Sequence, residues 1–167
     1  VLENPQNLGY AKGVNQGVAA STCEWILLLG SDAELQEGTL SHMLEFMEGA
    51  SGYGACAPRL VGADGVTQRA CHRFPLPRTA LWFGTPLQGW LPDSSELRRY
   101  LFKDFSHEAD ADVEQPPATC LMLHRDVWDS LGGMDESLWL FYNDVDLCLR
   151  MRAEGLRIRF LSGASVQ

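Results

Sequence analysis

Apolar residues along the chain gather either in strand-length runs or at helical spacing, and this alternation predicts an α/β domain. Trp25 to Leu29 is an uninterrupted apolar run, which is typical of a strand buried on both faces. A helix is predicted from Glu37 to Glu48, because its apolar residues recur every three or four positions. Gly9 to Ala20 shows the same spacing and predicts a shorter helix. Asp32 therefore follows a strand and precedes a helix.

The same patterns recur through the rest of the chain. They predict three more strands and two more helices, at Tyr53 to Leu60, Ala118 to Leu123, Leu156 to Leu161, Asp126 to Leu131 and Asn143 to Glu154. A turn is expected at Asp64 and Gly65, followed by an extended stretch from Val66 to Arg73. Phe74 to Asp112 mixes prolines with aromatic residues, so we predict a long irregular segment with helix only near Ser95 to Phe102. Val1 to Glu3 reads as the end of a strand.

Length, composition and net charge limit the classes of function that the chain can have. The 167 residues fit one domain, and 46% hydrophobic with 21% charged residues is ordinary for a globular protein. A net charge of −9 argues against a nucleic-acid partner, because phosphate backbones are held by clustered Lys and Arg. The same charge would repel an anionic nucleotide, so a nucleotide ligand here implies an accompanying Mg²⁺ or Mn²⁺.

The cysteines and the hydropathy pattern bear on location. The five cysteines are odd in number and lack zinc or redox spacing, so we expect reduced, mostly buried thiols: Cys23, Cys56, Cys71, Cys120 and Cys148. No apolar run approaches the roughly 20 residues of a membrane-spanning helix. The expected location is cytoplasmic, at the inner face of the membrane if regions outside this chain attach it there.

Two acidic positions are candidates for chemistry. Asp32 follows a predicted strand, and ligands of open α/β sheets bind at the carboxyl ends of strands, where a carboxylate can hold Mg²⁺ or Mn²⁺ against phosphates. A turn or capping role for Asp32 is the alternative. Asp144 follows Asn143 at the start of a predicted helix, where acids are stabilised by the helix dipole and Asn is a favoured cap. An aromatic-rich segment, Gly132 to Tyr142, precedes it.

Three blocks of sequence resemble a known family. They are "NLGYAKGVNQG" from Asn7, "EWILLLGSDAEL" from Glu24 and "LGGMDESLWLFYNDVDLCLRMRAEGLRIRF" from Leu131. Together they are similar to family 2 of the inverting glycosyltransferases, particularly its rhamnosyltransferase-like members. The resemblance implies the GT-A fold, a mixed sheet flanked by helices, over residues 1–167 as one catalytic domain. Because the family's first strands and a late His are absent, a fragment truncated at both ends is expected.

The resemblance assigns roles residue by residue. Asp32 matches the last acid of an Asp-x-Asp-like motif that holds the metal at the donor's diphosphate, and Ser31 occupies the middle position of that motif. Asn15 and Gly17 match a segment near the nucleotide. Asp144 matches the general base that activates the acceptor hydroxyl. The family usually has Glu where this chain has Asn143, which keeps a helix cap but removes one charge.

The implied reaction transfers a sugar, with inversion, from a UDP- or dTDP-sugar to a glycan or lipid-linked acceptor. Gly30 and Asn143, which replace common acids, favour an alternative: a non-catalytic sugar- or nucleotide-binding module of a larger glycan-assembly protein. A third hypothesis is a metal-dependent nucleotidyltransferase or phosphohydrolase on a similar sheet. Product assays separate the three, because only the first forms a new glycosidic bond.

Overall fold

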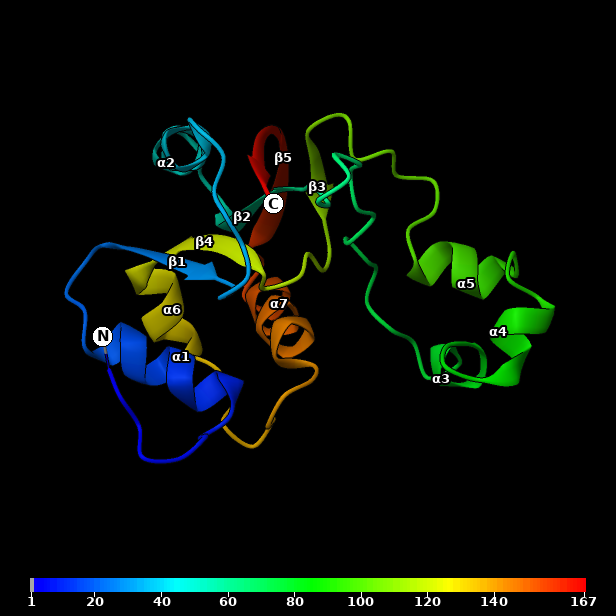
Figure 1. Ribbon diagram of the computed structural model, residues 1–167, viewed down its shortest axis with the longest axis horizontal. Coiled ribbons are helices and arrows are strands. Elements are labelled where there is room, and N and C mark those ends of the chain that lie inside the picture. The colour runs from blue at the N-terminus through cyan, green and yellow to red at the C-terminus, as the bar shows by residue number, and fades with distance from the viewer. Residues whose placement is uncertain (1) are drawn as a thin grey trace.

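The computed structural model describes residues 2–167 and contains a five-stranded mixed sheet in the order β1-β4-β2-β5-β3 (Figure 1). The strands are β1 (Trp25–Leu29), β2 (Tyr53–Leu60), β3 (Ala111–Val113), β4 (Cys120–His124) and β5 (Arg157–Val166). β2 and β5 are parallel, and the other pairs are antiparallel. The predicted mixed α/β sheet is thereby confirmed.

Helices cover both faces of this sheet. They are α1 (Tyr10–Ala19), α2 (Thr39–Gly49), α3 (Thr79–Trp82), α4 (Pro86–Trp90), α5 (Ser95–Tyr100), α6 (Arg125–Leu131) and α7 (Asn143–Ala153). Residues of α1, α6 and α7 form one hydrophobic core with one face of the strands, and α2 forms a second core with the other face. The two cores use alternate residues of β4, Leu121 and Leu123 in the first and Cys120 and Met122 in the second, as the two-residue period of a strand requires.

Several element predictions are confirmed and others are wrong. The helices at α1, α2, α6 and α7 and the strand β1 lie where the pattern placed them. β1 is not buried on both faces, however, and Leu29 is 40% exposed. The reason is that β1 pairs only with β4 among the described residues, so it forms an edge of the sheet. No strand forms at Leu2 and Glu3, which are exposed, and Val1 lies outside the described residues.

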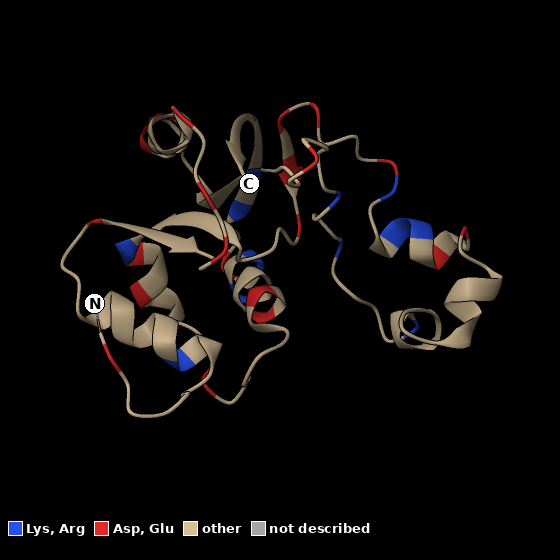
Figure 2. Ribbon diagram, viewed as in Figure 1, with Lys and Arg blue, Asp and Glu red and all other residues tan. Residues whose placement is uncertain are grey.

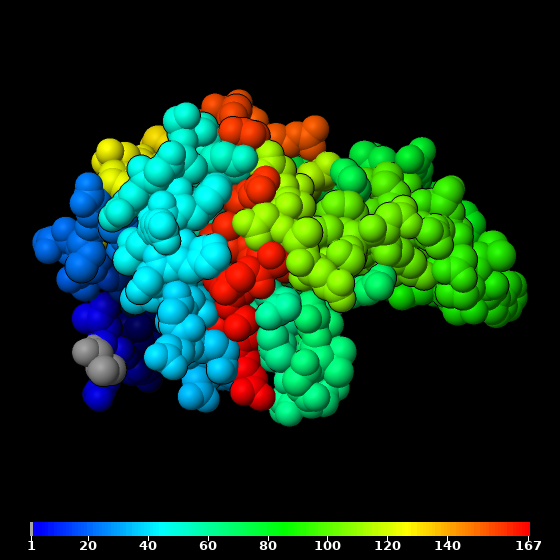
Figure 3. All heavy atoms as spheres, turned by 90° about the horizontal axis from the view of Figure 1, so that it is seen from above, coloured from blue at the N-terminus to red at the C-terminus, as the bar shows by residue number. Residues whose placement is uncertain are grey.

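The segment from Phe74 to Asp112 is more ordered than the sequence predicts. It contains α3, α4, α5 and β3, of which only α5 was predicted. The three helices form a lobe that extends away from the sheet (Figures 1 and 3). Helices of four and five residues leave no periodic signal long enough to be read from sequence, which explains why α3 and α4 were missed.

A buried carboxylate holds this lobe together. Glu96, 5% exposed, accepts hydrogen bonds from Arg78, Thr79 and Arg99. The hydrogen bond from Arg99 has the largest effect on the pKa of Glu96. Together the three bonds outweigh the opposing effect of burial and lower this pKa to about 2. Because the pKa of Glu96 is lower in the folded protein than in the unfolded chain, its ionised carboxylate stabilises the fold above the unfolded-state pKa of roughly 4.3. This stabilisation is lost as the pH falls toward the folded-state pKa.

Glu96→Gln is therefore expected to lower the melting temperature at neutral pH, and the difference from the unsubstituted protein should shrink between about pH 4.5 and pH 2. Thermal melts across this range measure it. Glu45→Gln, at an exposed position of α2, is the matched control and should shift melting little at any pH. A Glu96→Gln difference that stays constant down to pH 2 contradicts the ion-pair account.

Candidate active site

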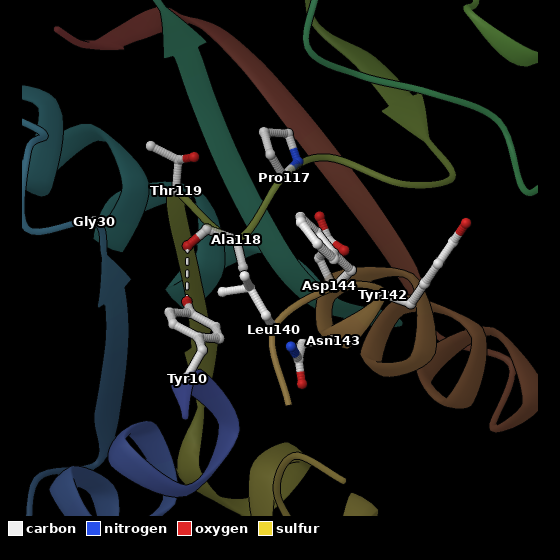
Figure 4. A pocket seen from close by; sticks show the side chains of 10 residues that line it. Tyr10, Gly30, Pro117, Ala118, Thr119, Leu140, Tyr142, Asn143 and Asp144 are labelled. Atoms are coloured by element: carbon white, nitrogen blue, oxygen red, sulfur yellow. Dashed lines mark hydrogen bonds between the residues drawn. The ribbon is translucent and has the colours of Figure 1, made fainter. Parts of the chain in front are cut away.

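A pocket of about 270 Å³ opens where α1, the end of β1, the start of β4 and the N-terminus of α7 meet. Figure 4 shows Tyr10 rising from α1 and Asp144 from α7 on opposite sides, with Ala118 between them and Thr119 further up on the Tyr10 side. The Tyr10 hydroxyl donates a hydrogen bond to the Ala118 carbonyl at 3.3 Å. Gly30 contributes the β1 side of the pocket. Asp144 therefore faces a concave site of the kind that binds small ligands.

Asp32 lies beside this pocket in a second one, of about 240 Å³. Thr119 lines both pockets, and the Gly30 amide donates to the Thr119 carbonyl at 2.8 Å. The Asp32 carboxylate folds back over Gly30, with Oδ1 only 3.0 Å from where a Cβ on Gly30 would lie. Asp32 and Asp144, 112 positions apart in the printed sequence, thus border adjoining pockets on one side of the molecule.

The negative charge of Asp144 affects the pKa values of three aromatic side chains. Burial raises the pKa of Tyr10, and the negative charge of Asp144 raises it further. Burial likewise raises the pKa of Tyr100, with Tyr142 and Asp144 adding to the shift. For His72, burial lowers the pKa, and Asp144 opposes this effect. Asp144 therefore affects the pKa values of three aromatic groups that come from distant parts of the chain.

The entry into α7 differs from the prediction. Asn143 was expected to cap the helix, but Tyr142, with φ of 66°, is the capping residue, and Asn143 is the first residue inside the helix. Because the chain enters through this left-handed residue, the Asn143 side chain turns into the protein, where it is 4% exposed. Neither Oδ1 nor Nδ2 has a hydrogen-bond partner among the described residues. Asn143 nevertheless lines the pocket.

Asn15, Gly17 and Ser31 lie outside the Asp144 pocket. The Asn15 amide donates to the Met134 carbonyl at 2.9 Å and accepts from the Met134 amide at 2.9 Å, so it holds α1 against the loop that leads to α7. Gly17 lines a separate pocket along the open edge of β1. Ser31 is exposed in the turn before Asp32. The sequence did not predict the structural bonds of Asn15, because they join residues 119 positions apart.

Arg150 fixes the base of the same loop. Its guanidinium bonds Asp146 one turn earlier at 2.6 Å and donates to the carbonyls of Leu131 and Gly133, both at 2.8 Å. Asp146 is thus engaged in an ion pair, whereas Asp144 accepts only the hydrogen bond of the Val145 amide among the described residues. Of the two acids in the first turn of α7, Asp144 is the one available to a ligand.

The metal donors in the protein are few. Among residues 2–167, no group of three or more His, Cys, Asp or Glu side chains is arranged to hold a metal ion. Asp32 is a single exposed carboxylate, a donor set that fits Mg²⁺ or Mn²⁺ of the kind bound through one or two carboxylates plus substrate phosphates. It does not fit a metal held by protein ligands alone.

Comparison with family models identifies the family of this chain. A model of the family described as "Glycosyl transferase family 2" matches residues 1–129. The chain belongs to glycosyl transferase family 2. The fold agrees: a crystal structure of GalNAc-T7 with UDP, GalNAc and Mn²⁺ covers 99% of this chain with a TM-score of 0.68 at 13% identity, and the match takes in 31% of that protein. The chain thus has the GT-A fold.

Curated relatives in this family carry glycosyltransferase names. The low-salt glycan biosynthesis hexosyltransferase Agl10 of Haloferax volcanii is 22% identical over 94% of this chain and 47% of that protein. The N-acetylglucosaminyl-diphospho-decaprenol L-rhamnosyltransferase of Mycobacterium tuberculosis is 22% identical over 99% of this chain and 57% of that protein. The chain thus spans about half the length of the curated relatives it matches. The predicted family resemblance is confirmed.

Proposed function

We propose that this chain is the catalytic part of an inverting glycosyltransferase that moves a sugar from a UDP- or dTDP-sugar to a glycan or lipid-linked acceptor. The observation that supports it is the placement of Asp32 and Asp144 in adjoining pockets that share Thr119. A cation-bound diphosphate at one carboxylate and an acceptor hydroxyl at the other would then address one sugar between them. The cytoplasmic face of a membrane is the proposed location.

In the proposed mechanism, Asp144 accepts the proton of the acceptor hydroxyl as that oxygen attacks the anomeric carbon. The new carbon–oxygen bond forms on the face opposite the leaving group, and the bond to the diphosphate breaks with its electron pair, so the configuration inverts. A positioned base typically contributes roughly 10²- to 10⁴-fold. Asp32 would hold Mg²⁺ or Mn²⁺ together with the diphosphate oxygens. When bound, the cation supplies Lewis-acid stabilisation of the leaving group.

The nucleotide contacts expected of Asn15, Gly17 and Ser31 stay predictions. Asn15 supports the site through the Met134 loop, whose backbone it bonds twice. Gly17 borders the pocket along β1, and Ser31 lies in the turn after β1, where a donor nucleotide would extend from the Asp32 pocket.

The full-length protein that contains this chain provides the test. Incubation with a panel of UDP- and dTDP-sugars, Mn²⁺ and soluble or lipid-linked acceptors should yield a glycoside with the configuration opposite to that of the donor, as NMR of the product would establish. Binding of a nucleotide-sugar without any product would instead support the non-catalytic module. Release of phosphate or pyrophosphate without an acceptor would support the hydrolase or nucleotidyltransferase alternative.

Asn143 offers a separate prediction. A buried amide without partners costs the free protein roughly 1–3 kcal/mol, and a sugar hydroxyl in the pocket can satisfy both of its polar atoms. Asn143→Leu is expected to raise the melting temperature by a few degrees, since about 1 kcal/mol corresponds to roughly 2–4 °C at this size. It should lower kcat/KM about tenfold, because the ligand loses its partner.

Paired melting curves and initial rates on the Asn143→Leu protein measure both effects. Asn143→Asp serves as a second variant, since it keeps the acceptor oxygen but adds a charge beside Asp144. A fall in both melting temperature and rate for Asn143→Leu would mean that the amide stabilises the fold rather than a ligand.

A further inference from the structure

The lobe of α3, α4 and α5 exposes large apolar side chains at its far end. From Thr79 through Pro92 the chain has no charged residue, and α4 is accordingly tan throughout in Figure 2. The exposed residues of this stretch form what we call the apolar tip: Leu81 (65%), Phe83 (44%), Leu87 (38%), Trp90 (80%) and Leu91 (51%). Large exposed patches of this kind mark interaction surfaces in soluble proteins.

The composition of the apolar tip favours a lipid interface as its partner. Trp is enriched at membrane–water interfaces, because its ring is apolar and its N–H stays hydrated. Leu and Phe beside it supply the apolar area that buries in the acyl boundary. Residues 2–167 form no helix with the length and hydropathy of a membrane span.

The charge distribution specifies an anionic surface. Arg69 to Phe105 contains six Lys or Arg against three Asp or Glu, a net of three positive charges in a chain of net −9. The remainder of the chain is therefore strongly acidic. Arg78 directly precedes the charge-free stretch; its side chain is 62% exposed and pairs with Glu96. Arg98 lies six residues past Pro92; its side chain is 48% exposed and pairs with Asp104. Basic residues next to an apolar insertion strengthen binding to anionic lipids, while the acidic body would be repelled from the same surface.

One residue of the apolar tip contacts an aromatic residue whose pKa Asp144 affects. The Phe83 ring packs edge-on against Tyr100, with ring centroids 5.0 Å apart. Burial raises the pKa of Tyr100, and the charges of Tyr142 and Asp144 raise it further.

We propose that the apolar tip inserts into the headgroup region of an anionic lipid bilayer and so binds the enzyme peripherally to a membrane. Membrane binding through the tip does not depend on the reaction. Its consequence for catalysis, the delivery of a lipid-linked acceptor to Asp144, rests on the proposed function.

Vesicle sedimentation of the full-length protein tests the proposal. Binding is expected to vesicles that contain phosphatidylglycerol, and only weakly to pure phosphatidylcholine. The double variant L81S/W90S should lose at least about tenfold in partition coefficient, because two large apolar side chains no longer bury. L40S/V66S, which changes exposed residues of α2 and of the loop after β2 (44% and 62%), is the matched control and should bind as the unsubstituted protein does.

Fluorescence locates the contact. Brominated lipids should quench Trp90, and Trp90→Phe should reduce that quenching, with Trp82 of α3 the other tryptophan of the lobe. Equal vesicle binding by L81S/W90S and the control overturns the proposal. It is also overturned if these substitutions dissociate a dimer in the absence of lipid, or if Trp90 is already shielded from acrylamide before vesicles are added, because the tip is then covered by a second copy or by another part of the protein.

The two proposals fail in different ways. If the proposal of membrane binding through the tip is wrong, the L81S/W90S protein still transfers sugar to lipid-linked acceptors as well as it does to soluble acceptors. If the glycosyltransferase assignment is wrong, no product forms with any acceptor, while vesicle binding and its loss in L81S/W90S are unaffected.

Discussion

Asp144→Asn is expected to abolish sugar transfer while leaving donor binding nearly unchanged. The substituted amide has the same shape but cannot take the acceptor proton, so the rate should fall by roughly 10²- to 10⁴-fold. Folding should be retained, because the Asp144 carboxylate accepts only the neighbouring Val145 amide among the described residues, and an amide oxygen can do the same. Product formation by chromatography and donor affinity by calorimetry measure the two quantities.

Asp129→Asn is the matched control, since Asp129 is exposed on α6, away from the pocket residues. It should transfer sugar at the unsubstituted rate. Asp146→Asn tests a different role, because it breaks the ion pair with Arg150. It should lower the stability of the fold more than it lowers the rate of sugar transfer. Unchanged turnover in the Asp144→Asn protein would remove Asp144 from the role of base.

Asp32→Asn is expected to weaken metal-dependent nucleotide binding by at least about tenfold. The chain offers one carboxylate at the pocket that would take the diphosphate, so its loss removes the only protein charge that we assign to the cation. Without Mn²⁺, both proteins should bind the nucleotide weakly and alike, since the net charge of −9 repels it. Titration calorimetry of UDP and dTDP with and without Mn²⁺ measures the difference.

Glu34→Gln is the control for Asp32→Asn. Glu34 is exposed two residues further along, and its backbone, not its carboxylate, pairs with Gln167. If Glu34→Gln weakens binding as much as Asp32→Asn, the effect is one of general charge. If neither variant changes the dependence on Mn²⁺, Asp32 does not hold the cation.

The tertiary structure adds a reason for Gly30 that the sequence alone did not provide. In sequence terms Gly30 replaces an acid of the family motif, which suggested a loss. In the structure its missing side chain leaves room for the Asp32 carboxylate, which lies 3.0 Å from where a Cβ would be. A larger residue at this position would have to displace Asp32 from its present place beside Thr119.

Local patterns determined the elements with long periodic signals. The apolar run Trp25–Leu29, the amphipathic α2 and the acidic start of α7 were predicted from sequence, because burial of a strand face or helix face imposes a period on neighbouring residues. The resemblance in three blocks gave the family. The short helices α3 and α4 and the edge position of β1 were not predictable, since four or five residues carry no period and pairing partners are distant in sequence.

The sequence by itself determined the α/β class, the family and the two acids on which the proposed reaction depends. Only the tertiary structure decided that Asp32 and Asp144 border adjoining pockets, that Asn143 is buried without a partner instead of capping α7, and that Asn15 bonds the Met134 backbone. Each of these depends on contacts between segments far apart in the chain, such as the 119 positions between Asn15 and Met134. A local pattern records which face of an element is buried, whereas the identity of the group that it meets is fixed when the elements pack.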